Sequence, residues 1–156
     1  MAKPNLVVIG NGMAGARAVE DILARGGADQ FEITTFGDEP YGNYNRILLS
    51  NVLNGSQEES EIFLNPLEWY KANDITLHRN VYVETILRKS RCVLGGEGTV
   101  EPFDKLVIAT GSSAYIPPME GLMLPDGGYK PGLFVFVPKT TAARSPDTPV
   151  ERAGRP

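Results

Sequence analysis

A glycine-rich motif follows a short apolar run near the start of the chain. Residues 6–9 read Leu-Val-Val-Ile, and Gly10, Gly12 and Gly15 follow with the spacing G-x-G-x-x-G. This arrangement is typical of the turn between a buried strand and a helix that binds a dinucleotide pyrophosphate. The first glycine permits the tight turn, the second lets the backbone approach the phosphates, and the third lets the helix pack against the strand.

The residues after the motif have the pattern of a helix and a second strand. Apolar residues three, four, seven and eight positions after Gly15 share one helical face. Gly26 and Gly27 end this helix, and residues 31–36 form the next strand. Met13 and Ala14 begin the helix, where free N–H groups attract phosphate, so we count them with the glycines as candidate contacts.

An acidic pair follows the second predicted strand. A carboxylate about 20 residues beyond the glycines is expected to accept hydrogen bonds from ribose hydroxyls. Asp38 and Glu39 are both candidates. The alternative is an ordinary βαβ turn without a ligand, because glycines also cluster in common turns.

Composition narrows the function further. The 156 residues suffice for one domain with a core of its own, and the net charge of -4 argues against a nucleic-acid surface. No apolar run is long enough to span a bilayer, and the first strand starts too early for a signal peptide, so we expect a cytoplasmic protein. One histidine, His78, and one cysteine, Cys92, predict neither a metal site nor a Ser-His-Asp set, and no catalytic residue is assigned.

Residues 40–51 form a polar loop that leads into an apolar segment. Tyr41 and Tyr44 are suited to pack against a ring, and Arg46 to a forked contact with a phosphate. The alternative is a surface loop that caps a short helix over Arg46–Leu53. Chemistry alone leaves the two interpretations open.

Three segments resemble the N-terminal flavin domain of the large subunit of NAD(P)H-dependent nitrite reductase, an FAD-dependent pyridine nucleotide-disulfide oxidoreductase. They are residues 39–50 (EPYGNYNRILLS), residues 64–78 (LNPLEWY and ITLH) and residues 103–112 (FDKLVIATGS). The likeness covers about residues 5–137. Related reductases often carry a lysine near the flavin where this chain has Asn51. That departure separates it from the rubredoxin and ferredoxin reductase branch.

The resemblance implies FAD as the cofactor and NAD(P)H as the electron donor, held by a separate inserted domain. It places Gly10, Gly12 and Gly15 at the pyrophosphate and Glu39 at the adenosine ribose. The other residues that it implies are Asn45 and Arg46 along the FAD, Val83 at the adenine, and Ala109, Thr110 and Gly111 over the pyrophosphate region. Metal-centre domains or subunits of the longer enzyme are the implied electron acceptors.

The fold class expected is α/β: a three-layer, Rossmann-like FAD/NAD(P)-binding domain with a parallel sheet and an antiparallel β-meander. We expect a short helix over Pro66–Asn73 and a buried strand over Leu106–Ala109. Short strands around 75–79, 81–87 and 90–94 are assigned to the meander, and a hairpin turn at the glycines of 95–98 joins them to Thr99–Glu101. Trp69 is interpreted as a packing residue and His78 as structural.

The last part of the chain has a different amino-acid composition. Residues 132–136 suit a strand, whereas residues 138–156 have the scattered prolines and small polar residues of a disordered tail. We therefore expect an incomplete FAD-binding domain over residues 1–137. A truncation or altered reading frame is the hypothesis for the tail.

Two functions follow from the sequence. The first is the FAD-binding portion of a nitrite-reductase-type oxidoreductase, inactive alone because one cysteine cannot hold an iron–sulfur cluster. The second is a stand-alone, non-catalytic nucleotide-binding module. Missing segments would leave apolar surface exposed, so a homo-oligomer is expected.

Overall fold

The structure is a computed structural model that describes residues 2–114 and 136–137. The described residues belong to two units, one of residues 2–110 and one of residues 111–114 with 136–137. Along these ranges, no helix is long and apolar enough to cross a membrane.

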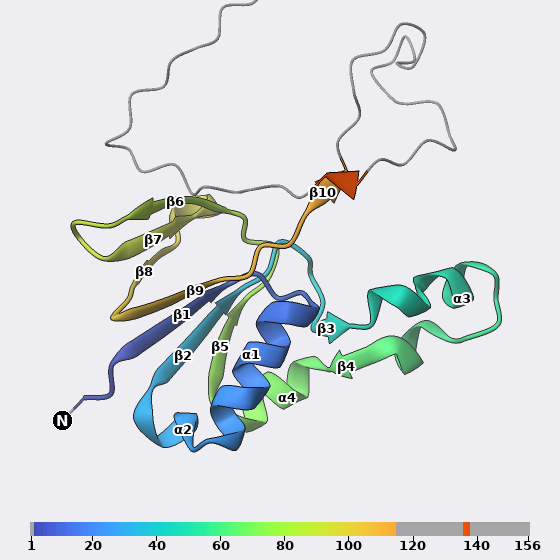
Figure 1. The fold of residues 1–156 in the computed structure, drawn as a ribbon, viewed down its shortest axis with the longest axis horizontal. Coiled ribbons are helices and arrows are strands. Elements are labelled where there is room, and N and C mark those ends of the chain that lie inside the picture. Colours follow the sequence, from blue (N-terminus) through green and yellow to red (C-terminus); the bar gives the residue numbers. More distant parts are fainter. Residues whose placement is uncertain (1, 115–135, 138–156) are drawn as a thin grey trace, which may run out of the picture. The chain divides into compact units, whose positions relative to one another are not determined.

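A four-stranded parallel sheet forms the centre of the first unit (Figure 1). Its strands are β1 (Asn5–Ile9), β2 (Glu32–Phe36), β5 (Ile75–His78) and β9 (Lys105–Ile108), in the order β5-β2-β1-β9. All three neighbouring pairs are parallel. Parallel neighbours require crossover connections, and helix α1 (Met13–Ala24) supplies the one between β1 and β2. The predicted βαβ unit is confirmed.

Helix ends lie close to where the sequence places them. Gly26, in the left-handed conformation at φ 76°, ends α1, but a further short helix that we did not expect, α2 (Gly27–Gln30), follows it. Helix α4 spans Leu67–Ala72, inside the predicted Pro66–Asn73. Pro66 caps α4 rather than occupying its first turn, because its ψ of 165° is extended.

Three antiparallel strands form the predicted meander: β6 (Val83–Leu87), β7 (Cys92–Gly95) and β8 (Val100–Pro102). A 3₁₀ turn at Gly96–Gly98 joins β7 to β8, which confirms the hairpin expected there. The assignment of residues 75–79 to the meander is wrong. Ile75–His78 instead pairs in parallel with β2, because helix α4 carries the chain back to the same end of the sheet.

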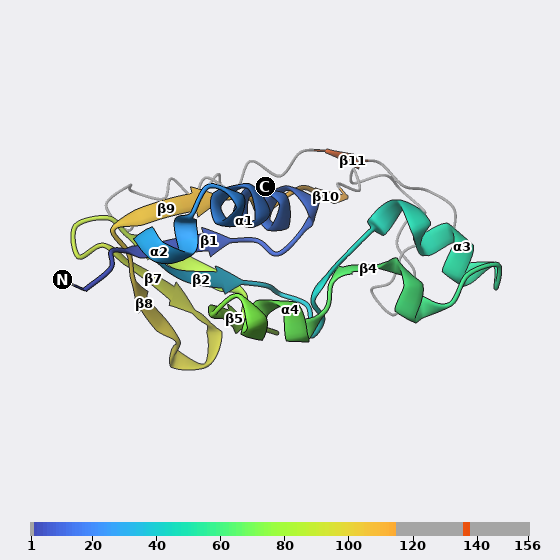
Figure 2. The ribbon, with the colours of Figure 1, turned by 90° about the horizontal axis from the view of Figure 1, so that it is seen from below.

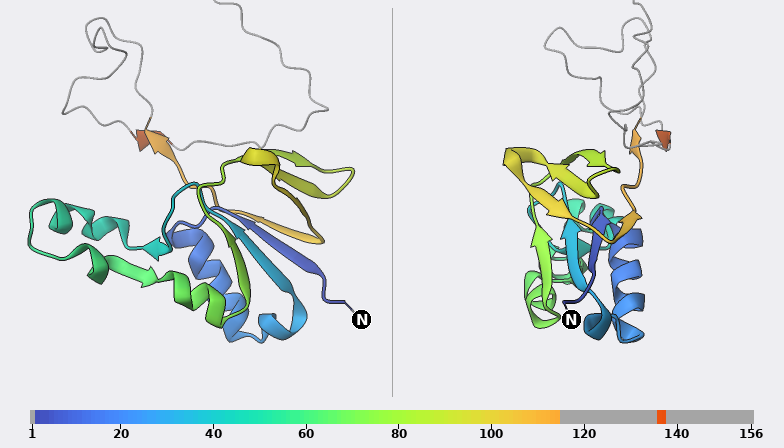
Figure 3. Two further views of the ribbon diagram at one scale, coloured as in Figure 1. Left: turned by 180° about the vertical axis from the view of Figure 1, so that it is seen from behind. Right: turned by 90° about the vertical axis from the view of Figure 1, so that its left-hand side faces the viewer.

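The sheet separates two apolar layers. Leu6 and Val8 of β1 face a cluster with Val19 of α1 and Tyr70 of α4, whereas Val7 and Ile9 face a cluster that includes the meander. This alternation follows from strand geometry, in which successive side chains point to opposite faces. Helix α1 and the meander accordingly lie on opposite sides of the sheet (Figure 3). The three-layer α/β fold is confirmed.

Strand β9 is less buried than its sequence suggests. Leu106 and Val107 are half-buried, and Ile108 keeps 52% of its surface exposed. The reason is that β9 is the last strand on its side of the described sheet. The strand expected over Leu106–Ala109 is thus present as Lys105–Ile108, but the expectation that it is buried is wrong.

Residues 45–62, here called the arm, project away from the sheet (Figure 2). The arm begins and ends at an antiparallel pair, β3 (Asn43–Tyr44) and β4 (Phe63–Asn65). It contains a 3₁₀ helix (Arg46–Leu48), helix α3 (Leu49–Leu53) and a second 3₁₀ helix (Glu59–Ile62). The helical segment predicted over Arg46–Leu53 is thus present, as two short helices, and none of its residues is buried.

The second unit contains an antiparallel pair of short strands, β10 (Ser113–Ala114) and β11 (Phe136–Val137). The strand predicted over 132–136 coincides with β11 only at Phe136. Residues 132–135 and the predicted tail, 138–156, lie outside the described residues.

Candidate functional site

The three motif glycines have different surroundings. Gly10 has a φ of +108°, and a Cβ atom there would lie 2.2 Å from the carbonyl oxygen of Ala109. A Cβ atom at Gly15 would lie 1.9 Å from the carbonyl oxygen of Gly10. Both distances are shorter than any real contact, so packing alone requires glycine at these positions. Gly12 is different, because a Cβ atom there would meet no described atom within 4 Å. Open space at this glycine is what a phosphate-binding turn requires.

The N-terminus of α1 faces this space without a side-chain cap. Gly12 is the N-cap residue, and among the described residues no side chain bonds to it as a cap and no acidic residue lies in the first turn. Met13 and Ala14, the first helical residues, are exposed. The first N–H groups of a helix have no intrahelical partner and carry partial positive charge, so this end is suited to an anion.

A cleft of about 290 Å³, including its open mouth, lies beside the motif. Four of the predicted site residues line it: Gly12, Asp38, Glu39 and Arg46. The other residues that line it are Asn11, Gly37, Tyr41, Gly42, Asn43 and Tyr44. These residues follow the carboxyl ends of β1 and β2, where ligands bind in open α/β sheets.

Glu39 and Arg46 form an ion pair in the cleft. Arg46 Nη2 donates to Glu39 Oε1 at 2.6 Å, and the guanidinium lies 5.6 Å from the centre of the Tyr44 ring. Burial of the ring, and next a hydrogen bond with Glu39, raise the pKa of the Tyr44 hydroxyl above its usual value. The acid predicted for ribose and the arginine predicted for phosphate are therefore neighbours in this structure.

The remaining predicted residues lie elsewhere. The Asn45 side chain accepts a hydrogen bond from the Ile47 amide at 3.1 Å and so caps the first helix of the arm. Val83 opens β6, pairs with Gly95 and packs on the meander side of the core. Ala109 contacts Gly10, as described above, and its amide donates to the Ile9 carbonyl at 2.8 Å. The three residues do not line the cleft.

Thr110 and Gly111 lie at the junction of the two units. Thr110 is the last described residue of the first unit and is exposed. Gly111 begins the second unit with a φ of +69°, a left-handed conformation that favours glycine.

Sequence reasoning missed three residues that support the motif. The Tyr70 hydroxyl donates to Asn11 Oδ1 at 2.6 Å, and Asn43 Nδ2 donates to the Asn11 carbonyl at 3.1 Å. Tyr70 and Asn43 are each 2% exposed. Asn11 lies inside the motif, at a position that the G-x-G-x-x-G spacing leaves unspecified, and its partners are 59 and 32 residues away. No local pattern indicates such a contact.

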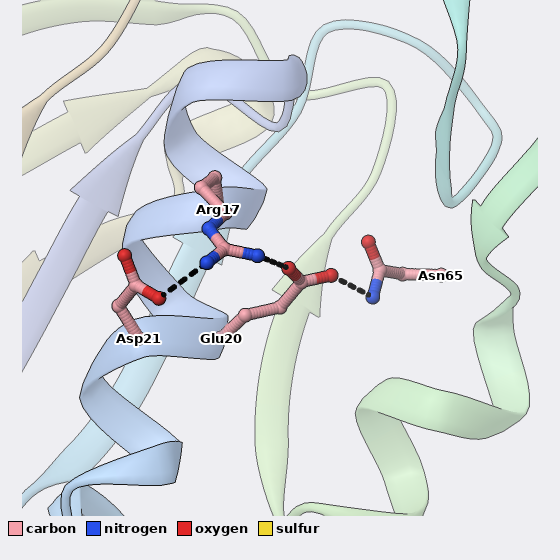
Figure 4. Close-up of polar contacts among 4 residues, drawn as sticks. All are labelled: Arg17, Glu20, Asp21 and Asn65. Atoms are coloured by element: carbon pink, nitrogen blue, oxygen red, sulfur yellow. Dashed lines mark hydrogen bonds and ion pairs between the residues drawn. The ribbon is translucent and has the colours of Figure 1, made fainter.

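A chain of polar contacts joins α1 to the base of the arm (Figure 4). Arg17 pairs with Glu20 at 3.5 Å and with Asp21 at 3.0 Å. Glu20 Oε1 also accepts from Asn65 Nδ2 at 2.9 Å, and Asn65 is buried in β4. These contacts hold β4, at the base of the arm, against the helix that follows the motif.

The single histidine has a structural environment, as we expected. His78 Nε2 lies 2.7 Å from Glu101 Oε1, and its ring packs against Phe36 with centroids 4.8 Å apart. Trp69 packs edge-on against Tyr70, in agreement with its interpretation as a packing residue. Within the described residues, no three His, Cys, Asp or Glu side chains are grouped as metal ligands.

Sequence comparison finds several oxidoreductases. The family model of the pyridine nucleotide-disulphide oxidoreductases matches residues 4–149. The nitrite reductase (NAD(P)H) of Bacillus subtilis is 46% identical over 121 residues, which cover 78% of this chain and 15% of that protein. The assimilatory nitrate reductase electron transfer subunit of the same organism is 44% identical, with 78% and 16% covered. The nitrite reductase (NADH) large subunit of Escherichia coli is 36% identical, with 78% and 14% covered.

Structure comparison agrees with this family. Putidaredoxin reductase, in its covalent complex with putidaredoxin, superimposes with a TM-score of 0.69 at 28% identity, covering 76% of this chain and 28% of that one. The NADH:rubredoxin oxidoreductase of Clostridium acetobutylicum shares the fold, with a TM-score of 0.66 at 23% identity, covering 76% and 30%. The chain spans about 15% of the length of the three curated relatives named above.

Proposed function

This chain belongs to the pyridine nucleotide-disulphide oxidoreductase family, and we propose that it is the FAD-binding portion of an oxidoreductase of the nitrite reductase type. In this proposal electrons pass from NAD(P)H through FAD to a metal centre in another part of a longer protein. The observation that carries the proposal is the cleft in which the open glycine, Gly12, lies beside the acid Glu39.

The residues of the cleft fit a dinucleotide. Gly12 leaves free space at an uncapped helix N-terminus, which suits a pyrophosphate. Glu39 presents a half-exposed carboxylate at the end of β2, where ribose hydroxyls can donate to it. Tyr41 and Tyr44 supply aromatic rings at the same cleft. The donor and acceptor set therefore matches a phosphate group, a ribose and a flat ring.

We assign roles to the predicted residues on this basis. The motif glycines with Met13 and Ala14 would hold the pyrophosphate, and Glu39, with Asp38 next to it, would hold the adenosine ribose. The other assignments are Asn45 and Arg46 along the FAD, Val83 at the adenine, and Ala109, Thr110 and Gly111 over the pyrophosphate region. FAD, when bound, supplies the chemistry that accepts a hydride and passes electrons on singly. The protein's part is to bind the cofactor and fix its orientation.

Arg46 has two candidate partners in this proposal. It pairs with Glu39 in the structure, but Glu39 is the acid assigned to the ribose. We infer that ribose hydroxyls replace the guanidinium at Glu39 and that Arg46 then turns to a phosphate. Arginine is suited to such an exchange because its planar fork binds carboxylate and phosphate in the same way.

The names of the relatives support an electron-transfer partner. One relative is an electron transfer subunit, and one structural neighbour is a reductase linked to putidaredoxin. We propose that residues 1–137 act with further metal-centre domains or subunits, in the cytoplasm. We also expect self-association, because missing segments would leave apolar surface exposed. Light scattering that shows a monomer at micromolar concentration would count against self-association.

A stand-alone nucleotide-binding module is the second candidate. The cleft's features suit a pyrophosphate and a ribose. Both of these groups belong to the adenosine diphosphate part that FAD shares with NAD. The cleft by itself therefore does not distinguish FAD from NAD.

The visible absorption spectrum tests the proposal. The purified chain is mixed with excess FAD, desalted and measured, with the Leu53→Ala variant as a matched control outside the cleft. Retained flavin absorbance that Gly12→Val abolishes and Leu53→Ala preserves is the expected result. A folded protein that refuses FAD but binds NADH or ADP in a titration would replace the proposal with the second candidate.

A further inference from the structure

The second residue of the glycine motif is held by buried groups from two distant elements. Tyr70 comes from α4 and Asn43 from β3, and both bond to Asn11. Asn11 also lies close to Gly37, which follows β2, because a Cβ atom at Gly37 would lie 3.0 Å from the Asn11 Cβ. The residue that precedes the open Gly12 is thus held by two hydrogen bonds and lies against a third segment.

The Tyr70 hydroxyl donates a hydrogen bond to Asn11 Oδ1 at 2.6 Å. The ring lies in the same apolar cluster as Ile33 and Ile75, where phenylalanine would bury the same ring. What the hydroxyl adds is a connection between α4 and the motif.

We propose that Tyr70 and Asn43 are positioning residues that hold Asn11, and through it the N–H groups at Gly12 and Met13, in the conformation that a dinucleotide pyrophosphate requires. A glycine-rich turn has many alternative conformations, and ordering it on binding reduces affinity. Contacts that order the turn beforehand remove that cost. The inference rests on the proposed dinucleotide-binding function.

A double-mutant cycle on the full chain tests the proposal by FAD titration. Tyr70→Phe removes one hydrogen bond and keeps the ring, so we expect Kd to rise roughly fivefold to tenfold. Asn11→Ala should raise Kd at least as much. Tyr70→Phe should then have no further effect in the Asn11→Ala background, because Tyr70 acts through Asn11. Additive effects would overturn the proposal.

Ile75→Val is the matched control, since Ile75 belongs to the same buried cluster on β5. It lowers stability without touching Asn11, so Kd should stay within about twofold of the wild type. An equal rise in Kd for Ile75→Val and Tyr70→Phe would mean that lower stability of the whole fold, and not the contact with Asn11, weakens binding. Asn43→Ala removes the hydrogen bond that β3 makes to Asn11, and it is the second variant if Tyr70→Phe does not fold.

Amide hydrogen exchange without any nucleotide separates this inference from the proposed function. Faster exchange at the Ala16 amide, which donates to the Gly12 carbonyl at 2.9 Å, in Tyr70→Phe but not in Ile75→Val is the expected result. If the wild type refuses FAD while the exchange changes as expected, the positioning role stands and the proposed function fails. Unchanged exchange in Tyr70→Phe overturns the positioning role whatever the FAD titration shows.

Discussion

The sheet-centred body and the arm are stabilised in different ways. Consecutive residues of β1 are buried on opposite faces, with Val7 1% exposed and Val8 0%. In the arm, no residue of Arg46–Leu53 is buried, and Ile47 and Leu53 are 75% and 86% exposed. The body completes a core with its own residues, whereas the first helices of the arm do not.

The arm instead depends on local hydrogen bonds and on its base. Asn45 caps its first helix, and Ser56 Oγ donates to the Asn51 carbonyl at 3.2 Å. At the base, Asn65 bonds to Glu20, and the Gly42 backbone lies so close to the Asn65 carbonyl that a Cβ atom would come within 2.1 Å. Short helices are marginal without tertiary packing. The comparison therefore indicates that the arm is the less stable region of the first unit.

Paired truncations should show the largest contrast between the two regions. Phe36→Ala removes a buried ring from the body and should lower the free energy of unfolding by about 3–5 kcal/mol. Leu53→Ala removes an exposed side chain from the arm and should change the free energy of unfolding by less than about 0.5 kcal/mol. Urea denaturation followed by circular dichroism measures both. A loss of similar size at Leu53 would mean that the arm is packed in solution, and the comparison would fail.

A second pair of variants makes the same contrast within the glycine motif. Gly15→Ala forces a methyl group against the Gly10 carbonyl and should cost about 3 kcal/mol of stability. Gly12→Ala meets open space, so the free energy of unfolding should change by less than about 0.5 kcal/mol while FAD binding weakens. Denaturation and flavin titration on both variants separate the two roles. Equal stability losses would show that Gly12 also has a packing function.

The contrast also explains which features the sequence could predict. The strands and helix of the first βαβ unit follow from local patterns, since a consecutive apolar run, a helical face and glycine ends lie within about 30 residues of each other. The acid at the end of β2 is likewise found by counting from the glycines. These predictions need no knowledge of distant residues.

Features that depend on distant partners could not be predicted. Ile75–His78 has the pattern of any short strand, and only its pairing with β2 places it in the parallel sheet. The exposure of Ile108 depends on which strand lies beyond β9, and that is not a property of its own segment. The bond between Tyr70 and Asn11 joins residues 59 positions apart. Glu39 and Arg46 are closer to each other in sequence. Their chemistry predicted a ligand for each of them, ribose for Glu39 and phosphate for Arg46, and did not predict that they pair with each other.

Alkaline pH should affect the body through Tyr70. Burial raises the pKa of the Tyr70 hydroxyl above its usual value of 10.0. Above pH 10 the unfolded chain therefore releases this proton before the folded chain does, so the folded state binds more protons and its stability falls as the pH rises. Below that pH the contribution is fully present. Urea denaturation from pH 8 to 11 should show a shallower decline for Tyr70→Phe than for the wild type. Parallel declines would mean that the hydroxyl ionises equally easily in both states.

The smallest effect is expected where the arm meets the cleft, at the ion pair of Glu39 and Arg46. Both side chains are substantially exposed, 39% and 54%, and ion pairs of this kind contribute about 0–1 kcal/mol because water and salt screen them. Arg46→Gln should therefore lower the free energy of unfolding by less than about 0.5 kcal/mol. Denaturation at low and high salt measures this, with Arg17→Gln, which breaks two exposed pairs on α1, for comparison. If Arg46→Gln, but not Arg17→Gln, lowers the free energy of unfolding by more than about 1 kcal/mol in a salt-dependent way, the ion pair stabilises the position of the arm. The arm would then be held by the cleft itself, and a ligand that displaces Arg46 from Glu39 would release it.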